Sequence, residues 1–339
     1  MQKILVTGGA GFIGSGFVRT QLRDYPDQHI VVLDKLTYSG NLDNLKDLDQ
    51  NRYTFIQGDV NDPECVGKAL EGCEGIVHFA AESHVDRSLS GASDFIDTNV
   101  GGVNTLLSQA RELDIKRILL VSTDEVYGSV LEGSSVEDSP IVPRNPYSAS
   151  KAAGELLGVS YFESFGMPIV ITRGSNTYGP YQYPEKVLPL FISNAIDNEA
   201  LPLYGDGKNV RDWLHVEDHC SGIDFVFRKG EPGQAYNIAG ENERENIFLT
   251  KRILSLLGKP ESLIRYVEDR TGHDRRYSID SSKLKKLGWA PKIDFDEGIK
   301  LTVQWYQENE WWWRKIKSGE FKAYYEEHYR KRLEESTSE

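Results

Sequence analysis

The chain has 339 residues, of which 39% are hydrophobic and 27% charged, and its formal net charge at pH 7 is −13. These proportions are ordinary for a globular protein with its own buried core. The acidic balance argues against nonspecific binding to nucleic acid or to an anionic membrane, because clustered Lys and Arg attract those partners. The cysteines Cys65, Cys73 and Cys220 show no CxxC pairing and no histidine at metal-ligand spacing, which argues against a disulfide framework or a zinc site.

Through residue 175, short β-branched runs alternate with longer amphipathic segments. The spacing predicts, in chain order, strand Lys3–Thr7, helix Phe12–Leu22, strand Ile30–Asp34, strand Tyr53–Gln57, helix Cys65–Leu70, strand Gly75–Ala80, helix Val103–Leu113, strand Ile118–Ser122, helix Ala149–Phe165 and strand Ile169–Arg173. This rhythm is typical of βαβ units and predicts an α/β fold with a Rossmann-type doubly wound parallel sheet.

Beyond Tyr178 the chain is richer in Gly, Pro and charged residues, and its strands no longer alternate regularly with helices. We therefore predict a sheet region at residues 1–175 and a smaller C-terminal α/β region at residues 176–330. The Trp/Tyr-rich segment from Trp311 through Tyr329 predicts a helix that packs against the body, and residues 331–339 are expected to form a frayed tail. No apolar run reaches the ~20 residues that span a bilayer. Residues 1–3 lead directly into a strand without a signal peptide, so we expect a cytoplasmic location.

A glycine-rich loop at residues 8–14 (GGAGFIG) follows the first strand and opens the first helix. The spacing of Gly8, Gly11 and Gly14 permits a tight turn, close approach of the backbone to a pyrophosphate, and close packing of helix on sheet. Asp34 ends the second strand about twenty residues later, where a carboxylate can bind a ribose and would repel a 2′-phosphate. The pattern predicts that residues 1–175 bind NAD rather than NADP.

Two adjacent carboxylates, Asp124 and Glu125, follow Thr123 at the end of a predicted strand. Ligands of parallel sheets bind at the carboxyl ends of strands, and adjacent acids in opposite protonation states can move two protons. Taken alone, the pair could also form a solvated turn. Tyr147 and Lys151 are four residues apart on one helix face, where the cation favours the phenolate, so Tyr147 could remove a proton from a substrate hydroxyl as hydride leaves.

Motifs along the whole chain carry a resemblance to known enzymes. The loop at 8–14, the Tyr147 and Lys151 pair, residues 176–180 (NTYGP) and residues 211–218 (RDWLHVED) resemble the extended short-chain dehydrogenase/reductases that act on nucleotide sugars. Further segments narrow this to a resemblance to the dTDP-glucose 4,6-dehydratase family, and they are residues 79–88, 123–125, 179–186, 269–277 and 317–319.

The resemblance implies an NAD-dependent carbon–oxygen lyase of deoxysugar biosynthesis. Tyr147, assisted by Lys151, would take the proton of the 4-hydroxyl as hydride passes to NAD. Glu125 would remove the C5 proton and Asp124 would protonate the departing 6-hydroxyl, after which hydride returns to C6 and NAD is regenerated. Thr123 would hold the 4-oxygen.

The family also implies binding residues. The expected cofactor contacts are Gly8, Gly11, Phe12, Ile13, Gly14, Asp34, Lys35, Thr37, Asp59, Val60, Phe79, Ala80, Ala81, Ser83, Thr98, Tyr147, Lys151 and Thr177. The expected substrate contacts are Ser83, Thr123, Asn176, Glu185, Lys186, Leu188, Pro202, Tyr204, Arg211, Asn246, Arg270, His273 and Tyr277, with Arg211 and Arg270 at the diphosphate because a guanidinium fork suits phosphate oxygens. Thr177 departs from the family, where many members carry a second Asn.

Several alternatives stay open at this point. Another nucleotide sugar such as UDP-glucose or GDP-mannose could be the substrate, the reaction could be a 4-epimerisation, or the chain could be a non-catalytic NAD-binding regulator. His215 and His219 flank Glu217 in the order H-V-E-D-H, which is not the zinc-protease order, so we predict no metal. The resemblance implies a homodimer, in which Phe95, Ile96 and the helix after Ala149 are core or interface.

Overall fold

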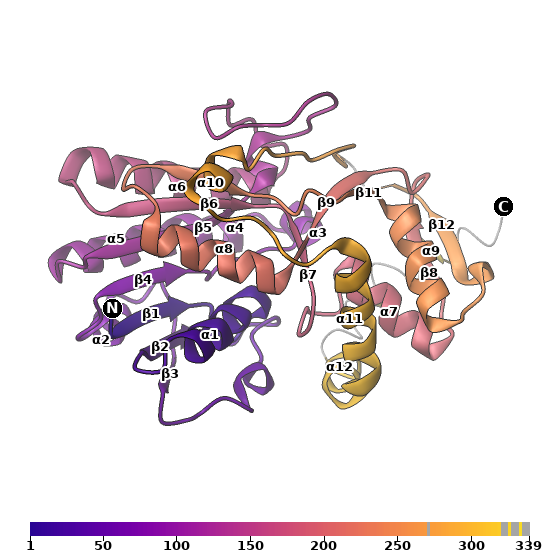
Figure 1. Ribbon diagram of the computed structural model, residues 1–339, viewed down its shortest axis with the longest axis horizontal. Coiled ribbons are helices and arrows are strands. Elements are labelled where there is room, and N and C mark those ends of the chain that lie inside the picture. The colour runs from indigo at the N-terminus through magenta and orange to yellow at the C-terminus, as the bar shows by residue number, and fades with distance from the viewer. Residues whose placement is uncertain (270–271, 320–324, 327–331, 334–339) are drawn as a thin grey trace.

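The computed structural model describes residues 1–269, 272–319, 325–326 and 332–333, and its centre is a seven-stranded parallel sheet (Figure 1). The strand order β10-β6-β5-β4-β1-β2-β3 contains the reversal beside β1 that is typical of doubly wound sheets. The predicted fold class is therefore confirmed. The strands of this sheet are β1 (Lys3–Thr7), β2 (His29–Asp34), β3 (Tyr53–Gln57), β4 (Gly75–His78), β5 (Arg117–Thr123), β6 (Ile169–Gly174) and β10 (Ala235–Ile238).

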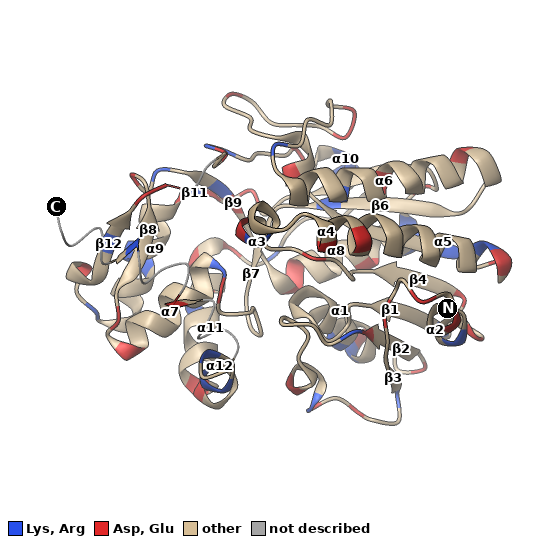
Figure 2. Ribbon diagram, turned by 180° about the vertical axis from the view of Figure 1, so that it is seen from behind, with Lys and Arg blue, Asp and Glu red and all other residues tan. Residues whose placement is uncertain are grey.

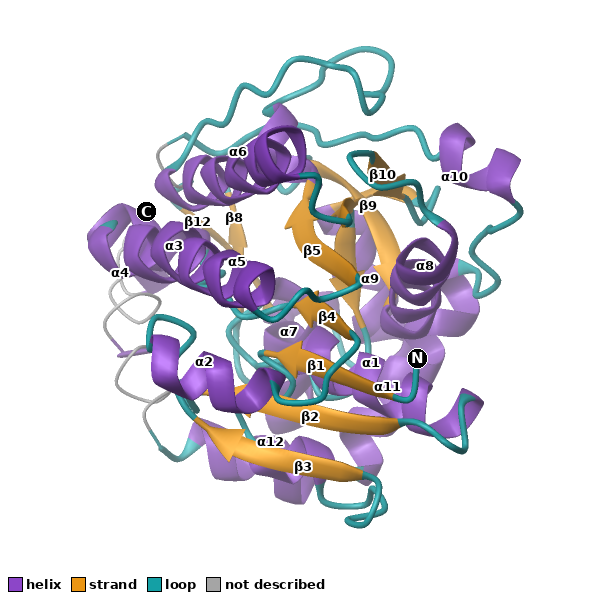
Figure 3. Ribbon diagram, turned by 90° about the vertical axis from the view of Figure 1, so that its left-hand side faces the viewer, coloured by secondary structure: helices purple, strands orange, loops and turns teal. Residues whose placement is uncertain are grey.

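Helices cover both faces of this sheet, because alternate side chains of each strand point to opposite faces (Figure 3). Ile4, Val6 and Leu119 pack into one core with Phe17 and Ile223, whereas Leu5 and Ile118 belong to a second core on the opposite face. The first face carries α1 (Phe12–Asp24), α8 (Val216–Lys229) and α10 (Ser282–Leu287), and the second carries α2 (Pro63–Leu70), α5 (Gly102–Glu112) and α6 (Pro146–Phe165).

The remaining elements form a smaller region with a third core around α7 (Val187–Asp197) and α11 (Phe295–Glu308). Two small sheets belong to it, in the orders β11-β9-β7 and β12-β8. Their strands are β7 (Asn176–Tyr178), β8 (Leu201–Tyr204), β9 (Val210–His215), β11 (Glu243–Glu245) and β12 (Ile264–Val267), and the other helices are α9 (Asn246–Leu257), α12 (Glu310–Lys317) and the short η4 (Glu261–Leu263).

The chain does not divide cleanly at residue 175. α8 and β10 come from the later half, yet β10 pairs in parallel with β6 and α8 packs on the large sheet. The physical reason is that Ala235–Ile238 is a short apolar strand that satisfies the open edge of β6. The assignment of cofactor binding to residues 1–175 and of substrate binding to residues 176–330 stays a proposal about function.

The predicted strands and helices are found with small changes at their ends. α6 begins at Pro146 rather than Ala149, because the side chain of Asn145 accepts a hydrogen bond from Ser148 N and Pro is favoured in a first turn. Short helical segments that were not predicted precede α5 or follow strands, namely η1 (Leu42–Leu45), α3 (Val85–Ser90), α4 (Ser93–Ile96), η2 (Asp97–Gly101) and η3 (Asp124–Tyr127).

The helix predicted from Trp311 through Tyr329 is found in its first part as α12, whose Trp312 and Trp313 are buried. α12 ends at Lys317, and residues 320–324 and 327–329 of the predicted helix lie outside the described part of the chain. The fraying predicted for the tail concerns mainly residues 334–339, which lie outside the described part of the chain. Within the part that the structure describes, no helix combines the length and the apolar character needed to cross a membrane.

Candidate active site

A cavity of about 800 Å³ opens at the carboxyl ends of the parallel strands. Residues that follow β1, β2, β3, β4 and β5 line it, together with α6 and the segment after β6. Ligands of doubly wound sheets bind where the strand order reverses, and here that position lies between β1 and β4. The topology therefore brings distant segments of the sequence to one site.

The glycine loop at one end of the cavity has the geometry of a diphosphate cradle. Gly8 has φ +67°, and an added Cβ would lie 2.7 Å from Ala80 N. A Cβ at Gly14 would lie 2.2 Å from the Gly8 carbonyl oxygen, so neither position accepts a side chain. Gly11 caps α1 without a side-chain acceptor, which leaves the first N–H groups of the helix to an anion. The loop therefore fits the diphosphate of a dinucleotide.

Asp34 lies at the end of β2 beside this loop, with its carboxylate largely buried. Its two oxygens accept hydrogen bonds from Ala10 N at 2.9 Å and from Leu36 N at 2.8 Å. Burial raises the pKa of this carboxyl, and the two backbone donors oppose that shift. Each oxygen has a second lone pair, so the carboxylate can still accept from ribose hydroxyls. Lys35 points its ammonium to Asp59 at 2.7 Å, across the same end of the cavity.

The acid pair and its hydroxyl lie at the end of β5, on the cavity wall. Thr123 caps η3: its hydroxyl accepts from Glu125 N at 3.3 Å and donates to Asp124 Oδ1 at 3.2 Å. Asp124 is 3% exposed, and its Oδ2 has no hydrogen-bond partner among the described residues. Burial raises the pKa of Asp124 well above its usual range, and the Glu125 carboxylate raises it further. Burial and the neighbouring charge therefore favour the protonated form of Asp124, which lies on the cavity wall.

Tyr147 and Lys151 lie on the cavity side of α6. Lys151 Nζ donates to the carbonyl of Val121 at 2.7 Å, which anchors the ammonium to β5. Burial lowers the pKa of Lys151 to about 8, while Glu155 one turn later opposes the shift. The pKa of Tyr147 is raised by burial first and by the charge of Glu125 second, and its hydrogen bond with Thr123 lowers it. Tyr147 thus needs an additional positive charge nearby before it can act as a base.

Known proteins match the chain over nearly its whole length. Residues 5–302 match the family model described as GDP-mannose 4,6 dehydratase. The dTDP-glucose 4,6-dehydratase of Streptomyces niveus is 47% identical over 322 residues, covering 93% of this chain and 96% of that protein. The chain belongs to the dTDP-glucose 4,6-dehydratase family. The low-salt glycan biosynthesis protein Agl12 of Haloferax volcanii is 51% identical over 304 residues, covering 89% of this chain and 98% of that protein.

A solved dehydratase has the same fold. The DesIV dTDP-glucose 4,6-dehydratase of Streptomyces venezuelae, whose structure contains NAD, superimposes with a TM-score of 0.91 at 49% identity. The match covers 93% of this chain and all of that chain. Together with the glycine loop and Asp34, this places the present chain among dehydratases whose sheet binds a dinucleotide.

The cavity brings together most of the residues that the dehydratase resemblance implied. The five catalytic candidates line it, as do the expected cofactor contacts from Gly8 to Thr177. Of the expected substrate contacts, those on the cavity wall are Ser83, Thr123, Asn176, Glu185 and Lys186. The cavity thus has room for a dinucleotide and a sugar beside the acid pair.

The other expected substrate contacts that the structure describes do not line this cavity. Tyr277 reaches the catalytic end from outside, with its hydroxyl 3.4 Å from Glu125 Oε2, and the guanidinium carbon of Arg211 lies 4.3 Å from the centre of its ring. The ring of Tyr204 meets that of His273 edge-on at 6.1 Å. Leu188 is buried in α7, Pro202 lies in β8 and Asn246 begins α9. Arg270 lies outside the described residues.

Thr177, the departure from the dehydratase pattern, directs its hydroxyl into the protein. Its Oγ1 lies 2.7 Å from His219 Nδ1 and donates to Ser175 O at 3.2 Å. Burial lowers the pKa of both His215 and His219 to about 4, so both are neutral at pH 7. His215 caps α8 through Nδ1, with Glu217 N as the donor. Among the described residues, no group of three or more His, Cys, Asp or Glu could hold a metal.

Two polar side chains at the site were missed. Asn145 Nδ2 donates to Glu125 Oε2 at 3.4 Å while its Oδ1 caps α6. Asn99 Nδ2 donates to Ser150 Oγ at 2.8 Å and to Glu82 O at 3.0 Å, linking the loop after β4 to α6. An Asn-Pro pair before a helix is a capping signal that could have identified Asn145, whereas nothing local in the sequence marks the role of Asn99.

Proposed function

We propose that this chain converts dTDP-glucose to dTDP-4-keto-6-deoxyglucose and water with a tightly bound NAD that is regenerated in each turnover. One observation carries this proposal: a buried Asp124, whose pKa is raised well above its usual range, stands beside Glu125 on the same cavity wall as Tyr147 and Lys151. Oxidation and return of a hydride need only the Tyr and Lys pair, whereas loss of water also needs an acid and a base on neighbouring atoms of the sugar.

Each side chain has one part in the reaction. The glycine loop and Asp34 would hold NAD, which when bound would supply the acceptor for the C4 hydride and the donor of hydride to C6. Tyr147 accepts the proton of the 4-hydroxyl, and the ammonium of Lys151 stabilises the phenolate. Thr123 donates a hydrogen bond to the 4-oxygen and so holds the sugar against Tyr147. Glu125 removes the C5 proton, which the new 4-keto group has acidified, and Asp124 gives its proton to the departing 6-hydroxyl. Glu125 then returns a proton to C5 as hydride reaches C6, and the proton that Tyr147 took from the 4-hydroxyl replaces the one that Asp124 gave up.

The residues proposed to bind the nucleotide come from segments outside the catalytic strand and helix. Glu185 and Lys186 line the cavity, and the segment with Tyr277 and Arg211 lies beyond Glu125. We assign the thymidine diphosphate to that direction, since a guanidinium suits phosphate oxygens. UDP-glucose and GDP-mannose are the competing substrates, and the 4-epimerase reaction is disfavoured because it makes no use of Asp124 and Glu125.

We further propose a cytoplasmic homodimer. α6 exposes Leu156 and Val159 to solvent at 57% and 39%, and Phe165 at its end is 49% exposed. A helix that is buried on one face by the sheet and apolar on the opposite face can pack against its copy in a symmetric dimer. Cell fractionation with the tagged full chain tests the location.

The deciding experiment incubates the purified chain with dTDP-glucose, without added reductant, and follows the mass and the alkaline absorbance of the nucleotide sugar. Loss of one water with a 4-keto chromophore and no net NADH is the expected result. A Tyr147→Phe variant serves as the control and should leave the sugar unchanged. Formation of dTDP-galactose at constant mass would instead establish an epimerase, and faster turnover of UDP-glucose or GDP-mannose would replace the thymidine substrate.

A further inference from the structure

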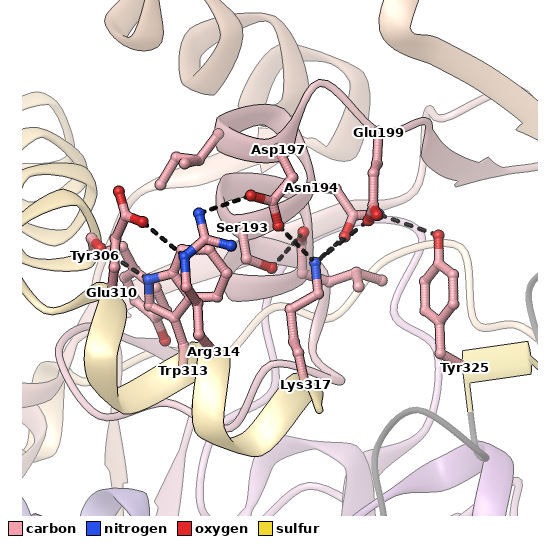
Figure 4. A network of polar contacts seen from close by, with 12 residues as sticks. Ser193, Asn194, Asp197, Glu199, Tyr306, Glu310, Trp313, Arg314, Lys317 and Tyr325 are labelled. Carbon is pink, nitrogen blue, oxygen red and sulfur yellow. Dashed lines mark hydrogen bonds and ion pairs between the residues drawn. The ribbon is translucent and has the colours of Figure 1, made fainter. Parts of the chain in front are cut away.

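Helix α12 of the smaller region contacts both the turn after β2, at the cofactor end of the large sheet, and α7. On one side Lys315 Nζ lies 2.5 Å from Asp43 Oδ2, in the turn η1 that follows β2. On the other side Arg314 lies 2.8 Å from Asp197 and Lys317 Nζ donates to Asn194 Oδ1 at 3.0 Å, at the end of α7. Figure 4 shows these two basic side chains pointing toward α7, and Figure 2 marks the basic last turn of α12 in blue.

A relay of two hydrogen bonds connects α12 to the glycine loop. Trp312 Nε1 donates to Asn44 Oδ1 at 2.8 Å, and Asn44 Nδ2 donates to the carbonyl of Ala10 at 2.9 Å. Trp312 and Asn44 are each 1% exposed. Because an indole N–H can only donate, it fixes the amide of Asn44 with its oxygen toward Trp312 and its NH₂ toward Ala10. A residue near the end of the chain thus orients a donor to the first cofactor loop.

The peptide groups of Ala10 are central to the shape of that loop. Ala10 N donates to Asp34 Oδ2, and its carbonyl accepts from Asn41 N at 3.0 Å as well as from Asn44. Ala10 stands between Gly8, with its positive φ, and Gly11, the cap of α1. Movement of the Ala10 peptide would therefore disturb both the carboxylate expected at the ribose and the N–H groups expected at the diphosphate.

Trp312 also contacts the segment that follows β7. The ring of Trp312 meets Tyr181 edge-on at 5.7 Å, and the guanidinium carbon of Arg19 in α1 lies 4.5 Å from the centre of the Tyr181 ring on which it stacks. Arg19 also donates to the carbonyl of Asn44 at 2.5 Å. The contacts of Trp312 and Asn44 therefore form a buried junction between α1, η1 and α12. Asn44 connects this junction to the glycine loop through the carbonyl of Ala10.

We propose that Trp312 is a positioning residue for the cofactor, which through Asn44 holds the Ala10 peptide so that the glycine loop grips the diphosphate of NAD. The inference deepens the proposed function and rests on it, because an enzyme that reuses one NAD loses its turnover when the dinucleotide escapes in mid-cycle. The proposed contribution of Trp312 is retention of NAD. The positions of the acid pair and of Tyr147 do not depend on it.

The test compares Trp312→Phe with a matched control, Trp313→Phe. Trp313 is also buried and also donates its indole N–H, but to Tyr306 O at 2.8 Å and not toward the loop. The full chain is loaded with NAD and desalted, and the NAD that remains is measured over time by an enzymatic cycling assay. We expect Trp312→Phe to release NAD about three- to tenfold faster than the unmodified protein, which is the effect of one buried hydrogen bond, and Trp313→Phe to release it at the unmodified rate.

Two further measurements separate positioning from a general loss of stability. Asn44→Ala should accelerate NAD release as much as Trp312→Phe does, and the double variant should be no faster than Asn44→Ala, because the residues act in series. The affinity of the NAD-loaded protein for dTDP should stay unchanged in Trp312→Phe. Equal NAD release by Trp312→Phe and Trp313→Phe, independent effects in the double variant, or parallel losses of NAD and dTDP affinity would overturn the proposal. Turnover of dTDP-glucose by the unmodified protein is measured separately, and its absence would refute the proposed function without altering this comparison.

Discussion

Asp124 and Glu125 are neighbours in the chain but have different surroundings. Asp124 is enclosed and keeps one oxygen without a partner among the described residues. Glu125 Oε2 lies 3.4 Å from both Asn145 Nδ2 and the Tyr277 hydroxyl, two groups that can donate to a carboxylate. Burial and the charge of Glu125 raise the pKa of Asp124 well above its usual range. One residue is thereby suited to give a proton and the other to take one.

The two halves of the reaction should separate in single substitutions. Glu125→Gln keeps the side-chain volume and removes the base, so oxidation at C4 should continue while exchange of the C5 proton with deuterated solvent falls about 100-fold. Tyr147→Phe should suppress the oxidation itself. Rapid-quench mass spectrometry follows both steps with dTDP-glucose. Equal loss of oxidation and exchange in Glu125→Gln would contradict the role assigned to Glu125.

At the scale of elements, α6 begins with a capping box that also serves the site. The side chain of Asn145 accepts from Ser148 N at 2.8 Å, and Ser148 Oγ accepts from Asn145 N at 3.3 Å. Pro146 at the first helical position reinforces this start. Further along, Glu155 pairs with Arg173 of β6 at 2.8 Å and fixes the helix on the sheet. The start of α6 thereby fixes how Tyr147 and Lys151 face the cavity.

The two functions of Asn145 can be tested with a pair of substitutions. Asn145→Ser keeps a capping oxygen and loses the amide that donates to Glu125, whereas Asn145→Ala loses both. We expect the Ala variant to lose about 1 kcal/mol of unfolding free energy and the Ser variant much less. Both should slow C5 exchange about three- to tenfold. Urea unfolding and deuterium exchange measure the two effects, and full exchange in Asn145→Ser would show that the amide is not needed.

At the scale of the whole molecule, buried neutral histidines make the free energy of unfolding depend on pH. Burial lowers the pKa of His215 and His219 to about 4, and burial followed by the charge of Lys151 lowers that of His78 to about 3. The unfolded chain protonates each near its ordinary value of about 6.5. Between pH 6.5 and pH 4 the unfolded state therefore binds more protons than the native state, so stability is full above pH 6.5 and is lost as the pH falls.

The contribution of His215 can be isolated, because asparagine can also cap α8 but does not titrate. For a single histidine the loss of unfolding free energy between pH 7 and pH 4.5 is about 2–3 kcal/mol. We expect His215→Asn to lose less stability than the unmodified chain over this interval by about that amount, whatever its stability at pH 7. Urea unfolding at several pH values measures the slope. Identical slopes in the two proteins would show that His215 is already charged in the native state.

The dimer proposed for α6 is also a property of the whole molecule. Val159→Glu places a charge on its exposed apolar face and should produce a monomer, because an unpaired charge is expensive to bury in an interface. Leu131→Glu, at a position that is 71% exposed in the loop after β5, serves as the control and should leave the mass unchanged. Sedimentation velocity measures the mass. A Val159→Glu protein with the mass of the unmodified chain would exclude this face as the interface.

The sequence by itself determined six of the seven strands of the large sheet, all but β10, and named the side chains to which the proposed chemistry is assigned. Alternation along strands such as Ile118–Ser122 and the glycine spacing at 8–14 are local patterns, so periodicity and turn chemistry suffice to identify them. The acid pair and the Tyr147 and Lys151 pair are also local, since each is defined within one element. The direction of the Asp124 pKa, by contrast, depends on burial, which belongs to the folded molecule.

Only the tertiary structure decided how distant segments meet. β10 returns to the edge of the first sheet, Tyr277 reaches Glu125 across 152 positions, and Trp312 reaches Asn44 across 268 positions. Contacts over such separations leave no period in the sequence, because they depend on where whole elements pack rather than on neighbours along the chain. For the same physical reason the sequence could name the expected substrate residues but could not show which of them share the cavity with the acid pair.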